Sequence, residues 1–269
     1  MARVRRMYEY LSDPFDVPPI EVDYTTKPVV AFLTQTVHLC DAVNHCKRHF
    51  PKNLDGNYTK DGRHALNLLS CSTLASMMGN FETFERALFA EVFELTAWMP
   101  NFQVNGCIKK LKNETSVNID VVALSGYRGY GAAAGTILAD RLGNWHTPSK
   151  VSAYFKAMFP EFSGFNKFHT RDLATLWQLR HSIVHTAGTI TRPDAQKVPD
   201  LSQMGDTEIV VPPTFVDAVG RRLHRVVRAF VMDLQDKTVA FAGDAYEGEL
   251  RQRLDAALEL RSPRNVWLQ

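Results

Sequence analysis

The chain has little of what marks a secreted, membrane-spanning or strongly charged protein. Its four cysteines among 269 residues are too few for a disulfide scaffold, so we expect a reduced, cytoplasmic protein. No stretch of about 18 residues is both apolar and free of charge, so no membrane contact is expected. The basic N-terminus lacks the apolar core of a secretory signal. The formal net charge is only +2, so a basic surface for nucleic acid would have to be local.

The hydrophobic content is sufficient for one sizeable core. At 45% hydrophobic residues, a chain of this length can bury such a core in a single domain with terminal additions. Several prolines predict an extended N-terminal arm over 1–27. We expect a helical domain over 28–240, followed by a C-terminal helix and tail over 241–269. The tail should be either mobile or docked through Trp267.

Helical periodicity dominates the rest of the chain. Apolar spacing and terminal signals predict helices over 29–50, from 61 or 65 to 98, over 170–188, over 214–237 and over 249–260. Between them, we expect one short helix that ends at 142 and another that begins at 148. Residues 100–125 are expected to form a loop region with short extended pieces, and 205–213 a short strand or extended arm. The expected fold class is all-α: an antiparallel helical bundle of four to five main helices with short extended decorations.

The most informative stretch is LWQLRHSIVHTAG at 176–188. On a helix of about 3.6 residues per turn, its apolar residues form one stripe, with Arg180 near the middle. His181 and His185 lie towards one edge of the stripe. Arginine in an apolar stripe is costly unless it meets an anion. We therefore expect Arg180 to face a carboxylate, a ligand or a second subunit.

This stretch resembles the signature of the HEPN superfamily of ribonucleases. The family motif is an arginine followed directly by a polar residue and, four to six residues after the arginine, by a histidine. Residues that fit this pattern are Arg180, His181 and His185, with Asp172, Leu173, Leu176 and Gly188 around them. The resemblance covers about 65–235 and implies metal-independent cleavage of RNA without a cofactor. It also implies a homodimer and the role of a toxin or antiviral effector, held in check by an antitoxin or sensor protein.

The resemblance assigns a role to each motif residue. His185 is expected to act as general base or acid, and Arg180 to bind the scissile phosphate and stabilise its charge. His181 is expected to assist by hydrogen bonding. Family members often carry an acidic residue on the neighbouring helix. The family pattern favours Glu82 for this role, whereas Glu85 lies in the middle of its own apolar stripe, as Arg180 does. One of the two is expected to pair with Arg180.

A second basic feature lies in the predicted helix at 214–237. Arg221, Arg225 and Arg228 share one face of that helix. Such a face is either solvated and balanced by carboxylates, or it binds an RNA backbone through aligned guanidinium groups. Tyr127, Arg128 and Tyr130 could stack on bases as a further contact.

Metal binding is a weaker reading of the histidines and cysteines. His181 and His185 have the spacing of two zinc ligands on one helix, but no third ligand is identifiable. The cluster of His38, Cys40, His45, Cys46 and His49 matches no zinc motif and is expected to comprise core cysteines and surface histidines. No metal site is therefore expected. The rival functions are a non-catalytic module that binds RNA, a nucleotide or a partner protein, and a metal-dependent helical hydrolase.

Overall fold

The computed structural model describes residues 22–115 and 133–269. Most of the expected N-terminal arm, and the residues Tyr127, Arg128 and Tyr130, lie outside these ranges. The α-helices are α1 (Pro28–His49), α2 (Lys60–Leu95), α3 (Val104–Thr115), α5 (Ala134–Arg141), α6 (Pro148–Met158), α7 (Lys167–His185), α8 (Arg192–Gln196), α9 (Pro213–Ala242) and α10 (Gly248–Ala257). Within the described residues, the strands are β1 (Thr189–Ile190) and β2 (Thr207–Glu208), which pair antiparallel. The chain is mostly helical, as the all-α prediction requires.

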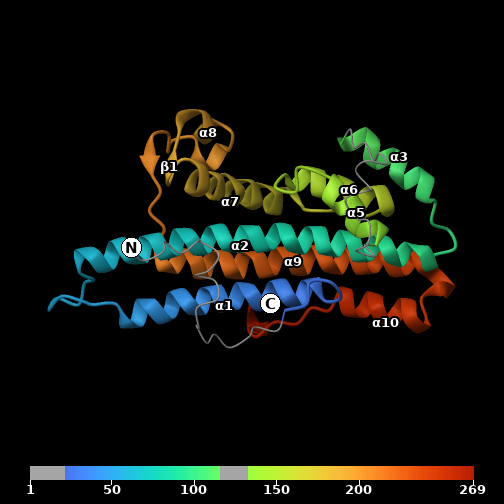
Figure 1. Cartoon of the computed structure of the whole chain (residues 1–269), viewed down its shortest axis with the longest axis horizontal. Coiled ribbons are helices and arrows are strands. Elements are labelled where there is room, and N and C mark those ends of the chain that lie inside the picture. Colours follow the sequence, from blue (N-terminus) through green and yellow to red (C-terminus); the bar gives the residue numbers. More distant parts are fainter. Residues whose placement is uncertain (1–21, 116–132) are drawn as a thin grey trace, which may run out of the picture.

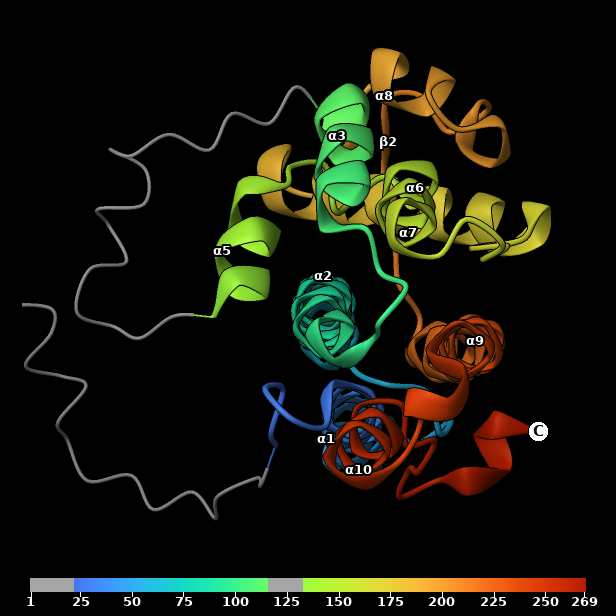
Figure 2. The same ribbon diagram turned by 90° about the vertical axis from the view of Figure 1, so that its right-hand side faces the viewer.

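The long helix α2 lies at the centre of the fold. It packs against α1, α9 and α10 on one side and against α5, α6 and α7 on the other (Figures 1 and 2). α1 runs antiparallel to α2, as predicted, but α2 and α9 run in the same direction. The reason is that the chain between them returns along the molecule through α3, α5, α6 and α7, so α9 begins at the same end as α2.

The helices α5, α6 and α7 are held against the rest of the fold by aromatic packing and by one close helix contact. Phe230 of α9 is in edge contact with Phe155 and Phe162, at ring-centroid distances of 5.1 Å and 4.9 Å. At the start of α5, a Cβ on Gly135 would lie 2.2 Å from the carbonyl oxygen of Ala90 in α2. Glycine is therefore required there, because any side chain would push α5 off α2.

Several helix boundaries differ from the sequence prediction. Residues 104–115 form α3 rather than a loop, because Cys107 and Leu111, four residues apart, bury one face of a short polar helix that packs on α6. α7 begins at Lys167, where Asn166 accepts a hydrogen bond from the His169 amide at 2.8 Å, and not at Thr170. α9 begins at Pro213 and runs to Ala242, beyond the predicted 237. α10 ends earlier than predicted.

The C-terminal tail is docked. Trp267 is 8% exposed and packs against His224 of α9 at a ring-centroid distance of 5.1 Å. The His224 Nε2 is 2.8 Å from the hydroxyl of Ser262, which fixes the start of the tail. In the described ranges, no helix has both the length and the hydrophobicity needed to cross a bilayer.

Candidate functional site

The motif residues occupy the last turns of α7. The helix ends where Ala187 and Gly188 adopt positive φ angles of 50° and 82°, and the Gly188 amide donates to the Ser182 carbonyl at 3.0 Å. α7 thus ends at His185, three residues before the predicted Gly188, and Gly188 lies in the turn that follows, where glycine adopts a positive φ without strain. The chain then enters β1 directly. As a result, Arg180, His181 and His185 lie next to the small sheet and α8.

Arg180 lies at the border between core and solvent. Leu173, Leu176 and Trp177 of the same stripe are buried, whereas Arg180 is half-buried. Its Nε atom is buried and has no hydrogen-bond partner among the residues that the structure describes. The Nε1 atom of Trp177, one turn earlier, is also buried and unpartnered. Buried donors without partners are rare and costly, so both atoms are candidates for contact with a ligand or another chain.

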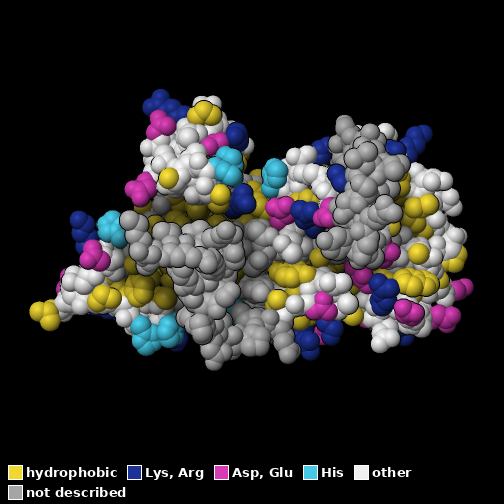
Figure 3. Space-filling view, viewed as in Figure 1, with side chains coloured by type: hydrophobic (Ala, Val, Ile, Leu, Met, Phe, Trp, Pro, Cys, Tyr) yellow, Lys and Arg dark blue, Asp and Glu magenta, His cyan; other side chains and the backbone are white. Residues whose placement is uncertain are grey.

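The two histidines of the motif are exposed and adjacent. Their rings are tilted against each other with centroids 4.8 Å apart. Figure 3 shows histidine side chains and Lys or Arg side chains over α7, beside a hollow between the α8 region and the α3 region. Asp194, a buried residue in the first turn of α8, lies near His181. Hydrogen bonds from Lys197 and Thr191, together with His181, lower the pKa of Asp194, so its carboxylate is ionised close to the motif.

The predicted ion pair between Arg180 and a glutamate of α2 is absent, so this prediction was wrong. Glu82 pairs instead with Arg86 at 3.5 Å. Glu85 is 1% exposed, and within the described part of the chain neither of its carboxyl oxygens has a hydrogen-bond partner. Burial and the nearby Glu82 raise the pKa of Glu85 well above its usual value. An apolar site favours the neutral form of a carboxylic acid, and a neutral acid does not need a cation beside it.

The arginines of α9 are all exposed but differ in their partners. Arg222 forms a 3.0 Å ion pair with Asp172 of α7. The Arg221 guanidinium lies 5.9 Å from the ring of Trp267. Among the described residues, Arg225 and Arg228 have no carboxylate within 4.0 Å. Of the two alternatives for this face, balance by carboxylates therefore describes Arg222. It does not describe Arg225 and Arg228, which belong to the predicted RNA-binding set.

The α9 arginines and the motif residues lie at opposite ends of α7. Arg221 and Arg225 line a cavity of about 520 Å³ between α7 and α9, together with Asp172 near the start of α7. Arg180 follows Asp172 by eight residues, which corresponds to about 12 Å along the helix axis. The C-terminal end of α7 also points away from α9 towards the side of α5 (Figure 2). The structure thus does not bring the two sets into one cavity.

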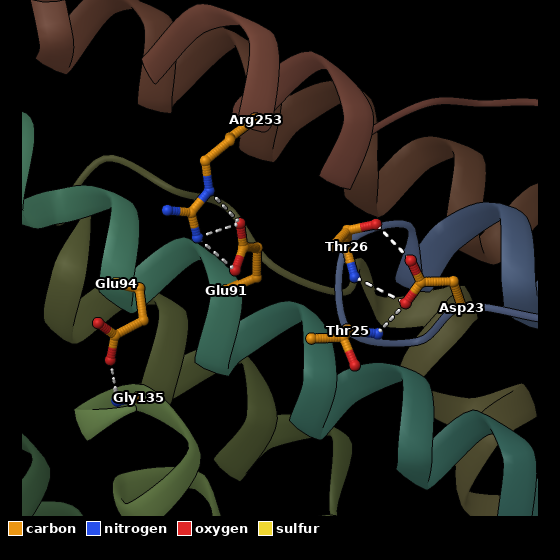
Figure 4. A network of polar contacts seen from close by, with 7 residues as sticks. All are labelled: Asp23, Thr25, Thr26, Glu91, Glu94, Gly135 and Arg253. Carbon is orange, nitrogen blue, oxygen red and sulfur yellow. Dashed lines mark hydrogen bonds and ion pairs between the residues drawn. The ribbon is translucent and has the colours of Figure 1, made fainter. Parts of the chain in front are cut away.

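A cavity of about 660 Å³ that the sequence did not predict lies between α2, α5 and α10. Glu91 forms a bidentate ion pair with Arg253 at 2.8 and 3.0 Å, and Glu94 accepts a hydrogen bond from the Gly135 amide (Figure 4). Nearby, Asp23 binds the amides of the turn that follows it. The hydroxyl of Tyr24, which also lines the cavity, is buried and has no partner in the ranges 22–115 and 133–269. Charged residues repeating along one side of α2 were the only available signal.

The cysteines and histidines of α1 are dispersed. Cys40 is buried, and burial raises the pKa of its thiol to about 12, which makes it unreactive. His45 and His49 are exposed with ring centroids 4.5 Å apart. In the part of the chain that the structure describes, no three potential metal ligands gather at one point.

No family model, curated protein or solved structure matches this chain. The functional assignment therefore depends on the geometry and chemistry described above and on the motif itself.

Proposed function

We propose that the chain is a HEPN-type endoribonuclease that cleaves RNA without a metal or cofactor. The observation that carries the proposal is the juxtaposition of two exposed, adjacent histidines with an arginine whose Nε donor is unpaired. A guanidinium group binds a phosphodiester through parallel hydrogen bonds, and an imidazole moves protons near neutral pH. These are the groups that phosphodiester cleavage by an internal nucleophile needs.

The reaction that fits these groups is attack of a ribose 2′-hydroxyl on its own phosphate. The new bond joins the 2′ oxygen to phosphorus, and the bond from phosphorus to the 5′ oxygen breaks. His185 accepts the proton of the 2′-hydroxyl or donates one to the leaving 5′ oxygen. Arg180 stabilises the charge that builds on the phosphate, and His181 assists by hydrogen bonding. The products are a 2′,3′-cyclic phosphate and a 5′-hydroxyl end.

A homodimer would complete this site. Of the cavities described above, none is lined by Arg180, His181 or His185, and both histidines face solvent. A phosphodiester would be better enclosed if the same edge of a second copy closed over it by two-fold symmetry. The second copy would also supply a second histidine, so that one acts as base while the other acts as acid. Such an enzyme would serve as a toxin or antiviral effector and would need a restraining antitoxin or sensor.

We call the surface formed by Arg180, His181 and His185 the motif edge. Its exposure to solvent also favours a second candidate function. A half-exposed arginine and two exposed histidines could bind RNA, a nucleotide or a partner protein without cleaving anything. Burial raises the pKa of Glu85, and among the described residues its carboxyl group has no hydrogen-bond partner, so it does not orient Arg180 for catalysis.

End-group analysis separates the two functions. Wild type, Arg180→Ala, His185→Ala and the exposed-histidine control His45→Ala would each be incubated with RNA. We expect 2′,3′-cyclic phosphate ends from wild type and the control, and none from the two motif variants. RNA that stays intact with correctly folded wild type, yet binds through Arg180, would replace the nuclease by the binding module.

A further inference from the structure

A basic surface continues from α9 across the C-terminal tail to the end of α1. Trp267 connects its parts, because the guanidinium groups of Arg221 and Arg264 lie 5.9 Å and 4.7 Å from the indole ring. We call this surface the basic band. Its cationic members are Arg221, Arg225, Arg228, Arg264, Lys47, Arg48 and Lys52.

The far end of the basic band is a cavity of about 510 Å³. Lys47, Arg48, Lys52 and Arg264 line it, together with Tyr58. The Tyr58 hydroxyl donates to the Lys47 carbonyl at 2.7 Å, and the Lys52 ammonium lies 5.2 Å from the Tyr58 ring centroid. These contacts fix the loop that follows α1, so the cations line a hollow of defined shape.

The carboxylates in the band are already engaged. Asp41 contacts Arg264, and Asp217 accepts hydrogen bonds from Asn44 at 3.0 and 3.2 Å. Within the described ranges, Lys47, Arg48 and Lys52 have no carboxylate within 4.0 Å. Asp172 and Asp200, which line the cavity between α7 and α9, are paired with Arg222 and Arg171. Cations therefore outnumber carboxylates in the band, although the whole chain carries a formal charge of only +2. Such an excess attracts an anionic partner.

The shape of the band favours a nucleic-acid strand over a flat anionic surface. The cations line successive hollows, since Arg221 and Arg225 border one cavity beside Trp267 and another beside α7. From Arg221 to Arg228 the helix advances about 10 Å, enough for several consecutive phosphates. Two of the guanidinium groups are held against an indole, so less side-chain entropy is lost when they bind.

We propose that the basic band binds the phosphate backbone of single-stranded RNA, at a site separate from the motif edge of α7. The band lies on α9, the tail and α1, whereas the motif edge is at the C-terminal end of α7. Binding there does not depend on the proposed cleavage. If the chain does cleave RNA, the band holds the substrate at a distance from the cut.

The test is binding of a fluorescein-labelled oligouridine of about 20 nucleotides to the full chain, measured by anisotropy over a range of salt. The variants are Arg48→Gln/Lys52→Gln and Arg225→Gln/Arg228→Gln. The matched control is Lys109→Gln/Lys112→Gln, which removes the same charge from exposed positions of α3. Each band variant should weaken binding roughly tenfold. It should also make the plot of log K against log salt less steep by about 1.4, because each of the two lost phosphate contacts contributes about 0.7 to the slope. The control should leave both unchanged.

Several outcomes overturn the proposal. One is that the band variants bind oligouridine as the control does while unfolding at the same temperature. Another is that wild type binds phosphatidylserine vesicles or polyglutamate but not oligouridine. A dinucleotide substrate, too short to reach the band, separates this inference from the nuclease. The band variants should cleave it normally, whereas absence of cleavage by wild type defeats only the nuclease.

Discussion

Replacing Glu85 by glutamine should stabilise the protein, and the gain should grow with pH. In the folded chain, burial raises the pKa of Glu85 well above its usual value, and the nearby Glu82 adds repulsion. In the unfolded chain the carboxyl is hydrated and titrates near 4.5. Above that pH the unfolded state releases a proton that the folded state still holds. The free energy of unfolding of the wild type therefore falls as pH rises.

The magnitude follows from proton linkage. For each pH unit between the unfolded and folded pKa values, the wild type loses up to about 1.4 kcal/mol relative to a protein without this group. Glu85→Gln keeps the shape of the side chain and removes the titration. The two proteins should be about equally stable at a pH below the unfolded pKa. The gap should then widen until the pH reaches the folded pKa and stay constant above it.

Denaturant unfolding at several pH values from about 4 to about 8 measures this gap. Glu249→Gln is the control, because Glu249 is exposed on α10. It should follow the wild-type curve at every pH. A difference between wild type and Glu85→Gln that does not change with pH would show that Glu85 is not a buried neutral acid. A cation would then have to be paired with it.

Three further predictions concern catalysis, helix contact and capping. His185→Ala and Arg180→Ala should each lower RNA cleavage by at least ~100-fold, and wild-type cleavage should persist in excess EDTA. Full activity in both folded variants would refute the site assignment. Gly135→Ala should destabilise the fold by about 1–3 kcal/mol, because its Cβ would meet the Ala90 carbonyl, as thermal unfolding would show. Gly79→Ala, with open space in α2, should instead be neutral or stabilising. Asn166→Ala should cost about 1 kcal/mol through loss of the α7 cap, and an unchanged midpoint would contradict this.

Helices with a strong apolar period could be predicted from the sequence, whereas weakly amphipathic ones could not. α1 and α2 lie close to their predicted bounds, since proline or polar caps mark their ends. α3 was missed because its lysines and asparagines hide a face of only two fully buried residues, Cys107 and Leu111. The parallel direction of α2 and α9 was also unpredictable, because it depends on the path of the intervening chain.

The candidate site likewise has features that the sequence predicts and features that it does not. Periodicity alone marked Arg180 and Glu85 as polar residues in apolar stripes, and both contain buried polar atoms without partners. Periodicity does not give the distance between two stripes, so their direct pairing was wrongly inferred. The cavity bordered by α10 could not be foreseen either. Its ion pair joins Glu91 to Arg253, residues 162 positions apart, and only the folded chain brings them together.

Two sets of polar groups at the edges of the helical core are available to a ligand. Inside the fold, Glu91 of α2 is instead held by a bidentate ion pair with Arg253 of α10. Among the described residues, buried donors without partners lie at the end of α7, and the cations of the basic band other than Arg264 have no carboxylate within 4.0 Å. Folding alone gives no reason to keep the buried unpartnered donors, since they cost stability. An anionic ligand would satisfy both, and an RNA strand carries enough phosphates to contact the two sets at once.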